Sequence, residues 1–234
     1  MGQFLHEFFS PLDFIRSVPT VWTGFILNVK LMLAAEALIL PLALLVAIVR
    51  GLPARAAAPL RAVAILYTDF FRGTPLILVL FIVEGFAQLN YFGLSAETLF
   101  RNGLIALVLV YTAYVTEVYR AGIESVHPSQ RMAARSLGLS YMQTMRYVVL
   151  PQAIRRVIPP LLNDFIGLQK DTALVTIIGL FEATAAANQY FSDYANPTAY
   201  VVAAIFFIFL TIPLARFTDH IIKQREQRER AQMV

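Results

Sequence analysis

Five long apolar segments constrain the fold of this chain more than any other feature. A helix that crosses the hydrocarbon core of a bilayer needs about 20 apolar residues, and 17 to 25 are tolerated. Backbone groups in lipid must be satisfied within the segment, which favours helices. With 58% hydrophobic and 15% charged residues, the chain also has little polar surface for a soluble domain. The sequence predicts an all-α integral membrane protein with five transmembrane helices, near residues 22–49, 62–85, 103–120, 158–183 and 198–216.

The distribution of basic residues predicts the orientation of these spans. Twelve Lys and Arg residues fall in the segments 50–61, 121–157 and 217–234, whereas the segments 1–21, 86–102 and 184–197 hold only Arg16 and Arg101. Short cytoplasmic loops are enriched in Lys and Arg. We therefore expect the N-terminus outside, the C-terminus in the cytoplasm, and a cytoplasmic segment 121–157.

Three regions follow from this topology. Residues 1–21 form an external segment with a short interfacial helix, for which Ser10 is the cap, Pro11 the first residue and Asp13 part of the first turn. Residues 22–216 form the transmembrane domain, and residues 217–234 a cytoplasmic tail. The chain has no cysteine, which excludes disulfides and thiolate metal sites.

Charged residues inside the apolar spans are candidates for function, because a charge in the bilayer must face a partner or a water-filled cavity. Asp69 and Arg72 are three residues apart, so they can pair on one helix face. The mid-depth charges sum to zero, a balance that a water-lined path for a zwitterion would have; they are Glu36, Arg72, Lys170 and Asp171. Ion pairs between helices explain them equally well. Gly73-Thr74-Pro75 adds a helix irregularity that either lines a cavity or only kinks the helix. The set of interest is Glu36, Arg72, Thr74, Glu84, Asp164, Lys170 and Asp171.

The polar segment 128–151 has the pattern of two short helices. Pro128 suits a first helical turn, Gly138 a left-handed helix end, and Ser140 with Gln143 a capping box that starts a second helix. We expect Pro151 to end that helix. Its expected apolar stripe is Tyr141, Met142, Met145, Val148 and Val149. From these residues alone, packing against the membrane domain and docking of a soluble partner both remain open.

The segment resembles the EAA loop of ATP-binding-cassette (ABC) import permeases: EAA, three residues, Gly, nine residues, then I-x-LP. Ala133-Ala134, Gly138 and Val148 to Pro151 match that spacing, whereas Met132 stands in place of the family's Glu. Further blocks are similar to the polar amino acid branch of the family, which includes histidine, glutamine and arginine permeases. These blocks are Phe71 to Leu76, Glu117 to Ile123, Leu150 to Ala153 and Lys170 to Leu174.

The resemblance implies the type I importer (MetI-like) fold and a bacterial inner-membrane permease subunit that is not itself an enzyme. Implied partners are two ATPase subunits that bind ATP and Mg, a second permease subunit, identical or paralogous, and an extracytoplasmic solute-binding protein. The coupling residues would be Met132, Ala133, Ala134, Gly138, Leu150 and Pro151. The substrate path would hold Arg72, Thr74, Glu117, Lys170, Asp171 and Thr172, with Glu36, Glu84 and Asp164 as weaker candidates. An ion-coupled secondary amino acid carrier is the alternative.

Overall fold

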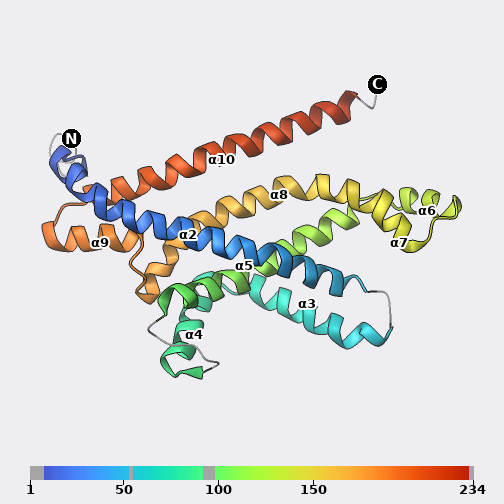
Figure 1. Ribbon diagram of the computed structural model, residues 1–234, viewed down its shortest axis with the longest axis horizontal. Helices are drawn as coiled ribbons and strands as arrows, with labels where there is room; N and C mark the ends of the chain where they lie inside the picture. Colours follow the sequence, from blue (N-terminus) through green and yellow to red (C-terminus); the bar gives the residue numbers. More distant parts are fainter. Residues whose placement is uncertain (1–7, 53–54, 92–97, 232–234) are drawn as a thin grey trace. The chain divides into compact units, whose positions relative to one another are not determined.

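The computed structural model describes residues 8–52, 55–91 and 98–231, and every regular element in these ranges is helical. Figure 1 follows the chain through them. The elements are α2 (Pro11–Arg50), the 3-10 turn η1 (Arg55–Ala57), α3 (Ala58–Gly73), α4 (Leu76–Gln88), α5 (Leu99–Glu124), α6 (Pro128–Ser136), α7 (Tyr141–Thr144), the π-helical segment η3 (Met145–Val149), α8 (Leu150–Asp171), the 3-10 segment η4 (Thr172–Ile178), α9 (Ala183–Tyr194) and α10 (Thr198–Ala231).

Three helices are long and apolar enough to cross a membrane, in Pro11–Arg50, Leu99–Glu124 and Thr198–Gln224. The bent pair α3 and α4 provides a fourth if it is counted as one broken span. These helices contain four of the five predicted segments, and the count of five stays a prediction.

The predicted segment 158–183 is not one helix. Helix α8 begins eight residues earlier, at Leu150, and ends at Asp171; η4 follows and ends at Gly179, whose φ is +94°. The early start has a local cause, because the preceding π-helical turn runs directly into α8. The end is explained by the left-handed conformation of Gly179, which closes a helical segment without steric cost.

The expected short interfacial helix is also different in the structure. The Ser10 side chain accepts a hydrogen bond from the Asp13 N–H at 3.4 Å, so the predicted helix start is confirmed. The helix then continues without a break to Arg50, over 40 residues. Such a helix is about 60 Å long, roughly twice the thickness of the hydrocarbon core.

The described chain packs as two compact units. Unit 1 comprises Met1–Leu38, Thr74–Val110 and Phe165–Phe217; unit 2 comprises Ile39–Gly73, Tyr111–Asp164 and Thr218–Val234. Four helices, α2, α5, α8 and α10, contribute residues to both units. The charged cavity described below lies wholly within unit 2.

Unit 1 is held together by a cluster of small and aromatic side chains. Residues of α2, α9 and α10 form it, including Phe25, Ala186 and Val202. Gly24 permits a very close approach of α2 to α9: a Cβ at this glycine would lie 2.5 Å from the carbonyl carbon of Glu182. Small residues at a helix contact allow this spacing.

In unit 2 the end of α5 packs against η3 and the start of α8. Val126, Val149 and Ala153 form a buried cluster, and a Cβ on Gly122 would lie 2.1 Å from Cγ1 of Val157. The close contact at Gly122 brings the cavity wall of α5 against the first turns of α8.

The two-helix pattern of the segment 128–151 is largely confirmed. Helix α6 starts at Pro128, Gly138 has φ +82°, and Ser140 and Gln143 form the predicted capping box. Pro151 does not end the second helix, however. The π-helical turn η3 connects α7 to α8, and Leu150 N–H bonds Met145 O. This shift in the hydrogen-bond pattern leaves Pro151 in the first turn of α8, where its missing N–H costs little.

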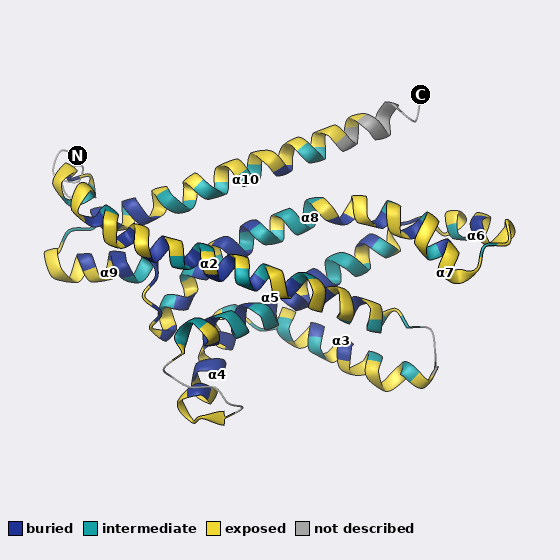
Figure 2. Cartoon of the chain, in the orientation of Figure 1, coloured by how far each residue is buried: buried dark blue, intermediate teal, exposed yellow. Residues whose placement is uncertain are grey.

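The apolar stripe predicted for the second helix is split in the structure. Val149 is buried and Met145 and Val148 are partly buried, but Tyr141 and Met142 are exposed. Figure 2 shows the exposed residues of α6, α7 and the turn between them in yellow. The change to π-helical geometry at Met145 breaks the 3.6-residue period on which the stripe was predicted.

Candidate functional site

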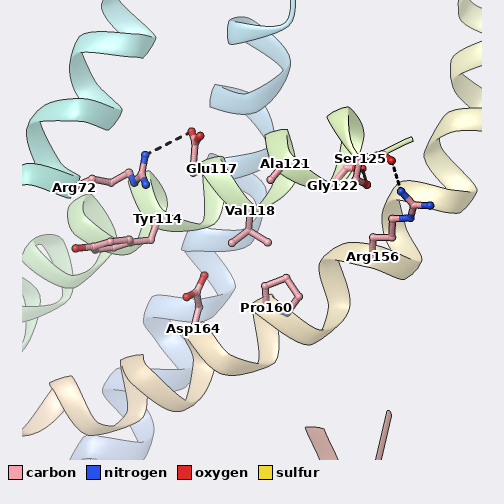
Figure 3. A pocket seen from close by; sticks show the side chains of 10 residues that line it. All are labelled: Arg72, Tyr114, Glu117, Val118, Ala121, Gly122, Ser125, Arg156, Pro160 and Asp164. Atoms are coloured by element: carbon pink, nitrogen blue, oxygen red, sulfur yellow. Dashed lines mark hydrogen bonds and ion pairs between the residues drawn. The ribbon is translucent and has the colours of Figure 1, made fainter. Parts of the chain in front are cut away.

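A charged cavity of about 380 Å³ lies between α3, α5 and α8 in unit 2 (Figure 3). Helix α3 contributes one arginine at its last turn, α5 contributes the central wall, and α8 the opposite wall. The lining residues are Arg72, Tyr114, Glu117, Val118, Ala121, Gly122, Ser125, Arg156, Pro160 and Asp164.

Glu117 is the hub of an ion-pair network at this cavity. Its carboxylate lies 2.9 Å from Nη1 of Arg50 and 3.8 Å from Nη1 of Arg72, and it accepts hydrogen bonds from Arg120 on its own helix. Arg50 also donates to the Thr68 hydroxyl of α3 at 2.9 Å. One carboxylate therefore connects the end of α2, the end of α3 and the middle of α5.

Burial makes this network more than a surface ion pair. The side chains of Arg50 and Glu117 are 13% and 20% exposed, whereas that of Arg72 is 41% exposed. Partly buried pairs are screened less by water and salt than exposed ones. Arg50 and Glu117 thus form the buried part of the network, and Arg72 is its more exposed, cavity-lining member.

Asp164 faces the same cavity from α8, and Figure 3 shows its carboxylate pointing toward α5. Its Oδ2 atom is buried and has no hydrogen-bond partner within the described part of the chain. Burying a carboxylate oxygen without a hydrogen-bond partner costs free energy, unless a donor such as a ligand group occupies the cavity next to it. The cavity accordingly offers an arginine on one wall and a carboxylate on the other.

The predicted pairing of Arg72 with Asp69 is wrong. Asp69 is exposed on α3, and the ion pair of Arg72 within the described residues is with Glu117 of α5. The spacing of three residues indicated a shared helix face, but a carboxylate on a neighbouring helix is the one that lies within reach.

The remaining candidates of the substrate path belong to unit 1 and do not line this cavity. Thr172 is fully buried: its hydroxyl donates to Gln169 O at 2.7 Å and accepts from Asn28 Nδ2 at 3.2 Å. Glu84 is buried and accepts from Asn102 at 3.2 Å. Lys170 is exposed. The others, Glu36, Thr74 and Asp171, are partly buried.

Sequence reasoning did not find Arg50 and Arg120 as partners of Glu117, Arg156 at the cavity, or the buried acid Glu182. Arg120 follows Glu117 by three residues, a spacing that predicts a pair on one helix face. No sequence spacing indicates the pairing of Arg50 with Glu117, because the two residues are 67 positions apart in the chain. Glu182 is fully buried, accepts from Asn28 Nδ2 at 2.9 Å, and caps α9 by accepting from the Ala185 N–H. Its carboxylate thus joins α2 to the start of α9.

The predicted coupling residues lie on α6 and the segments that follow it. Met132 and Ala133 are exposed, Ala134 is buried against the unit, and Leu150 and Pro151 are exposed at the start of α8. Two side chains fix this region to α5. Nη2 of Arg131 donates to Ile123 O at 2.6 Å, and Arg156 donates to Ser125 O. The segment 128–151 and the cavity thus belong to the same compact unit.

Residues 40–227 match the family of the binding-protein-dependent transport system inner membrane component. The chain belongs to this family. The chain is 35% identical over 209 residues, 87% of its length, to the inner membrane amino-acid ABC transporter permease protein YhdY of Escherichia coli K12. It spans 56% of the length of that relative. It is 34% identical to the probable glutamine ABC transporter permease protein GlnM of Bacillus subtilis 168, over 72% of this chain and 77% of that protein.

The protein is also similar to a chain in the crystal structure of an amino acid ABC transporter with histidines. The TM-score is 0.83 and the identity 32%, over 91% of this chain and 97% of that one. The all-helical architecture expected from the sequence is therefore that of an inner-membrane transport component.

Proposed function

We propose that this permease is a membrane-spanning subunit of an ATP-driven importer for a polar amino acid. The family match over residues 40–227 carries the proposal. The names of the relatives add the substrate class, since they mention amino acids, glutamine or histidines. ATP and Mg would be bound by two partner ATPase subunits, and an external solute-binding protein would deliver the substrate to a pair of permease subunits.

Five spans with an external N-terminus complete this proposal. The distribution of Lys and Arg between the two compact units supports this topology. All twelve basic residues of the predicted cytoplasmic segments belong to unit 2, whereas Arg16 and Arg101 belong to unit 1. A single cysteine introduced at His220 should be labelled from the cytoplasm alone; labelling from outside intact cells would contradict the orientation.

Unit 2 offers a direct path from the coupling segment to the cavity. A displacement of α6 would be transmitted to α5 through Arg131 and to α8 through the buried cluster of Val126, Val149 and Ala153. Helices α5 and α8 carry Glu117 and Asp164. ATP-driven movement of α6 would therefore reshape the cavity, as rigid-body alternating access requires.

The cavity suits a zwitterion by its charges and its size. Arg72 would face the carboxylate of an amino acid, and Asp164 its ammonium group. Its volume of about 380 Å³ lies near the lower end of the range for small-molecule pockets. We retain Lys170 and Asp171 as further residues of the path in unit 1. Neutralising any one of these two residues, or Arg72 or Asp164, should reduce uptake more than it reduces assembly of the complex.

Reconstitution with the cognate ATPase and binding protein tests the proposal. Uptake of a radiolabelled amino acid should require ATP and stop when the ATPase is inactivated. Uptake that persists without ATP in the presence of a proton or sodium gradient would instead identify an ion-coupled carrier. Asp164→Asn is the informative site variant, with Asp69→Asn on the exposed face of α3 as its control. Equal uptake by the two variants would remove Asp164 from the path.

A further inference from the structure

The outward surface of α6 and α7 combines exposed apolar side chains with small and polar ones. Met132 is 62% exposed, Leu137 83% and Met142 70%. Around them lie Ser129, Gln130, Ala133, Ser136 and Gln143, all exposed. An apolar centre with a polar surround is the usual anatomy of a protein interface. We call this surface, made of residues 129–143, the docking face.

The docking face carries positive charge without a compensating acid. From Ser125 to Asn163 the sequence contains five arginines and no Asp or Glu. Helix α6 has no acidic residue in its first turn, so the positive end of its dipole also lacks a carboxylate. Arg135, on α6, and Arg146, just beyond the docking face on η3, are exposed and form no ion pair within the described ranges.

Methionine at position 132 removes the one acid that the EAA pattern would place here. A Glu at this position would call for a basic group in the partner's groove. Met132 offers instead a flexible apolar side chain that fills an apolar pocket. Ala133 beside it leaves the helix backbone accessible to close approach.

We propose that the partner ATPase receives Met132 in an apolar pocket and surrounds that pocket with carboxylates that face Arg135 and Arg146. The proposal rests on the proposed function and goes beyond it by specifying the chemistry of the partner surface. A lipid surface fits less well. Exposed polar side chains, among them Gln130, Ser136 and Gln143, lie among the exposed apolar ones of the docking face, whereas a helix that lies in a membrane interface carries a broad apolar face.

Replacing Met132 by Glu or by Leu distinguishes an apolar groove with an acidic rim from a basic groove, because the two grooves predict opposite changes in affinity for the Glu variant. The affinity of the purified ATPase for the permease in nanodiscs is measured at low and at high salt. Met132→Leu should bind within about twofold of the wild type. Met132→Glu should weaken binding about tenfold or more, because a carboxylate would be buried without a partner among other acids. Tighter binding by Met132→Glu would mean that the groove is basic, and would overturn the proposal.

Reversing the charge of an arginine on the permease tests the acidic rim of the ATPase groove independently of its apolar centre. Arg135→Glu should weaken binding severalfold and reduce the dependence of the affinity on salt. Lys223→Glu on the exposed surface of α10 is the control for the same change in net charge, and should bind as the wild type does. An equal effect of the two reversals would contradict the acidic rim.

A third measurement separates this inference from the proposed function and from lipid binding. The chain has no cysteine, so Met132→Cys can be labelled with an environment-sensitive dye. The dye signal should change when the ATPase is added. A change caused by anionic lipid alone, before the ATPase is present, would assign the face to the membrane and refute the proposal. If the wild-type permease binds no ATPase at all, the proposed function fails; if it binds but none of these variants alters the affinity, only the groove chemistry fails.

Discussion

The contact of Gly122 with Val157 gives the most sharply defined prediction. It lies where α5 meets α8 within unit 2, on the route from α6 to the cavity. A Cβ at position 122 would be 2.1 Å from Cγ1 of Val157, while the next nearest atoms, Ala153 O and Val157 Cβ, are at 3.5 and 3.6 Å. Only Cγ1 of Val157 therefore excludes a side chain at this glycine.

Gly122→Ala should destabilise the permease by about 1–3 kcal/mol, the usual cost of an overpacked contact. Val157→Ala alone should cost about 1.5 kcal/mol or somewhat more, since two methyl groups leave a buried position. In the double variant the closest atoms would be at ordinary van der Waals distance. Its stability should therefore equal or exceed that of Val157→Ala, with a coupling energy of about 1–3 kcal/mol.

Thermal unfolding of the purified permease in one detergent measures these differences, at about 2–4 °C for each kcal/mol. Gly85→Ala is the matched control, because a Cβ there would meet nothing within 4 Å; it should be neutral or slightly stabilising. If Gly122→Ala is as stable as this control, or if the double variant is no better than the sum of the single ones, the packing argument is refuted. ATP-driven uptake by Gly122→Ala should fall with its stability and recover in the double variant.

Glu117→Gln should lower stability by about 1–3 kcal/mol, since Arg50 would stay poorly hydrated without its carboxylate; an unchanged melting temperature would show that the network is structurally dispensable. Gly138→Val should reduce ATPase retention during purification while Gly138→Asn largely preserves it, because Asn tolerates the left-handed conformation and a β-branched residue does not. Equal retention by both would argue against the turn. Asn28→Ala should cost about 2 kcal/mol or more, because buried Glu182 loses a donor. Asn28→Asp should be worse, since it places a second acid beside Glu182, and the reverse order would contradict this account.

Patterns of local chemistry predicted much of the architecture. The apolar segments predicted the long helices of α2, α5 and α10, and the broken pair α3 and α4 separates at Thr74-Pro75, the irregularity read from the sequence. The positions of proline, glycine and capping residues predicted α6 and the start of α7. These signals act within a few residues, so a sequence displays them directly.

Local sequence patterns gave wrong predictions where the backbone hydrogen bonds changed from the α-helical to the π-helical pattern. The π-helical turn at Met145–Val149 moved the following residues by one position, so Pro151 continued a helix that it was expected to end. It also split the predicted apolar stripe and left Tyr141 and Met142 exposed. No residue in this run specifies π-helical geometry by itself; packing of Val149 and Ala153 against Val126 accompanies it.

The candidate site shows the same division between local and long-range information. The sequence by itself determined that Arg72 and Asp164 are charges within apolar spans and so must be paired or face a cavity, and the family resemblance added Glu117. Only the tertiary structure decided that these three meet at one cavity, that Arg50 shares Glu117, and that Thr172 is a buried hydrogen-bond partner of Asn28. The physical reason is distance along the chain. Arg50 and Glu117 are 67 residues apart, and Asn28 and Thr172 are 144 apart, so their contacts arise only when the helices pack.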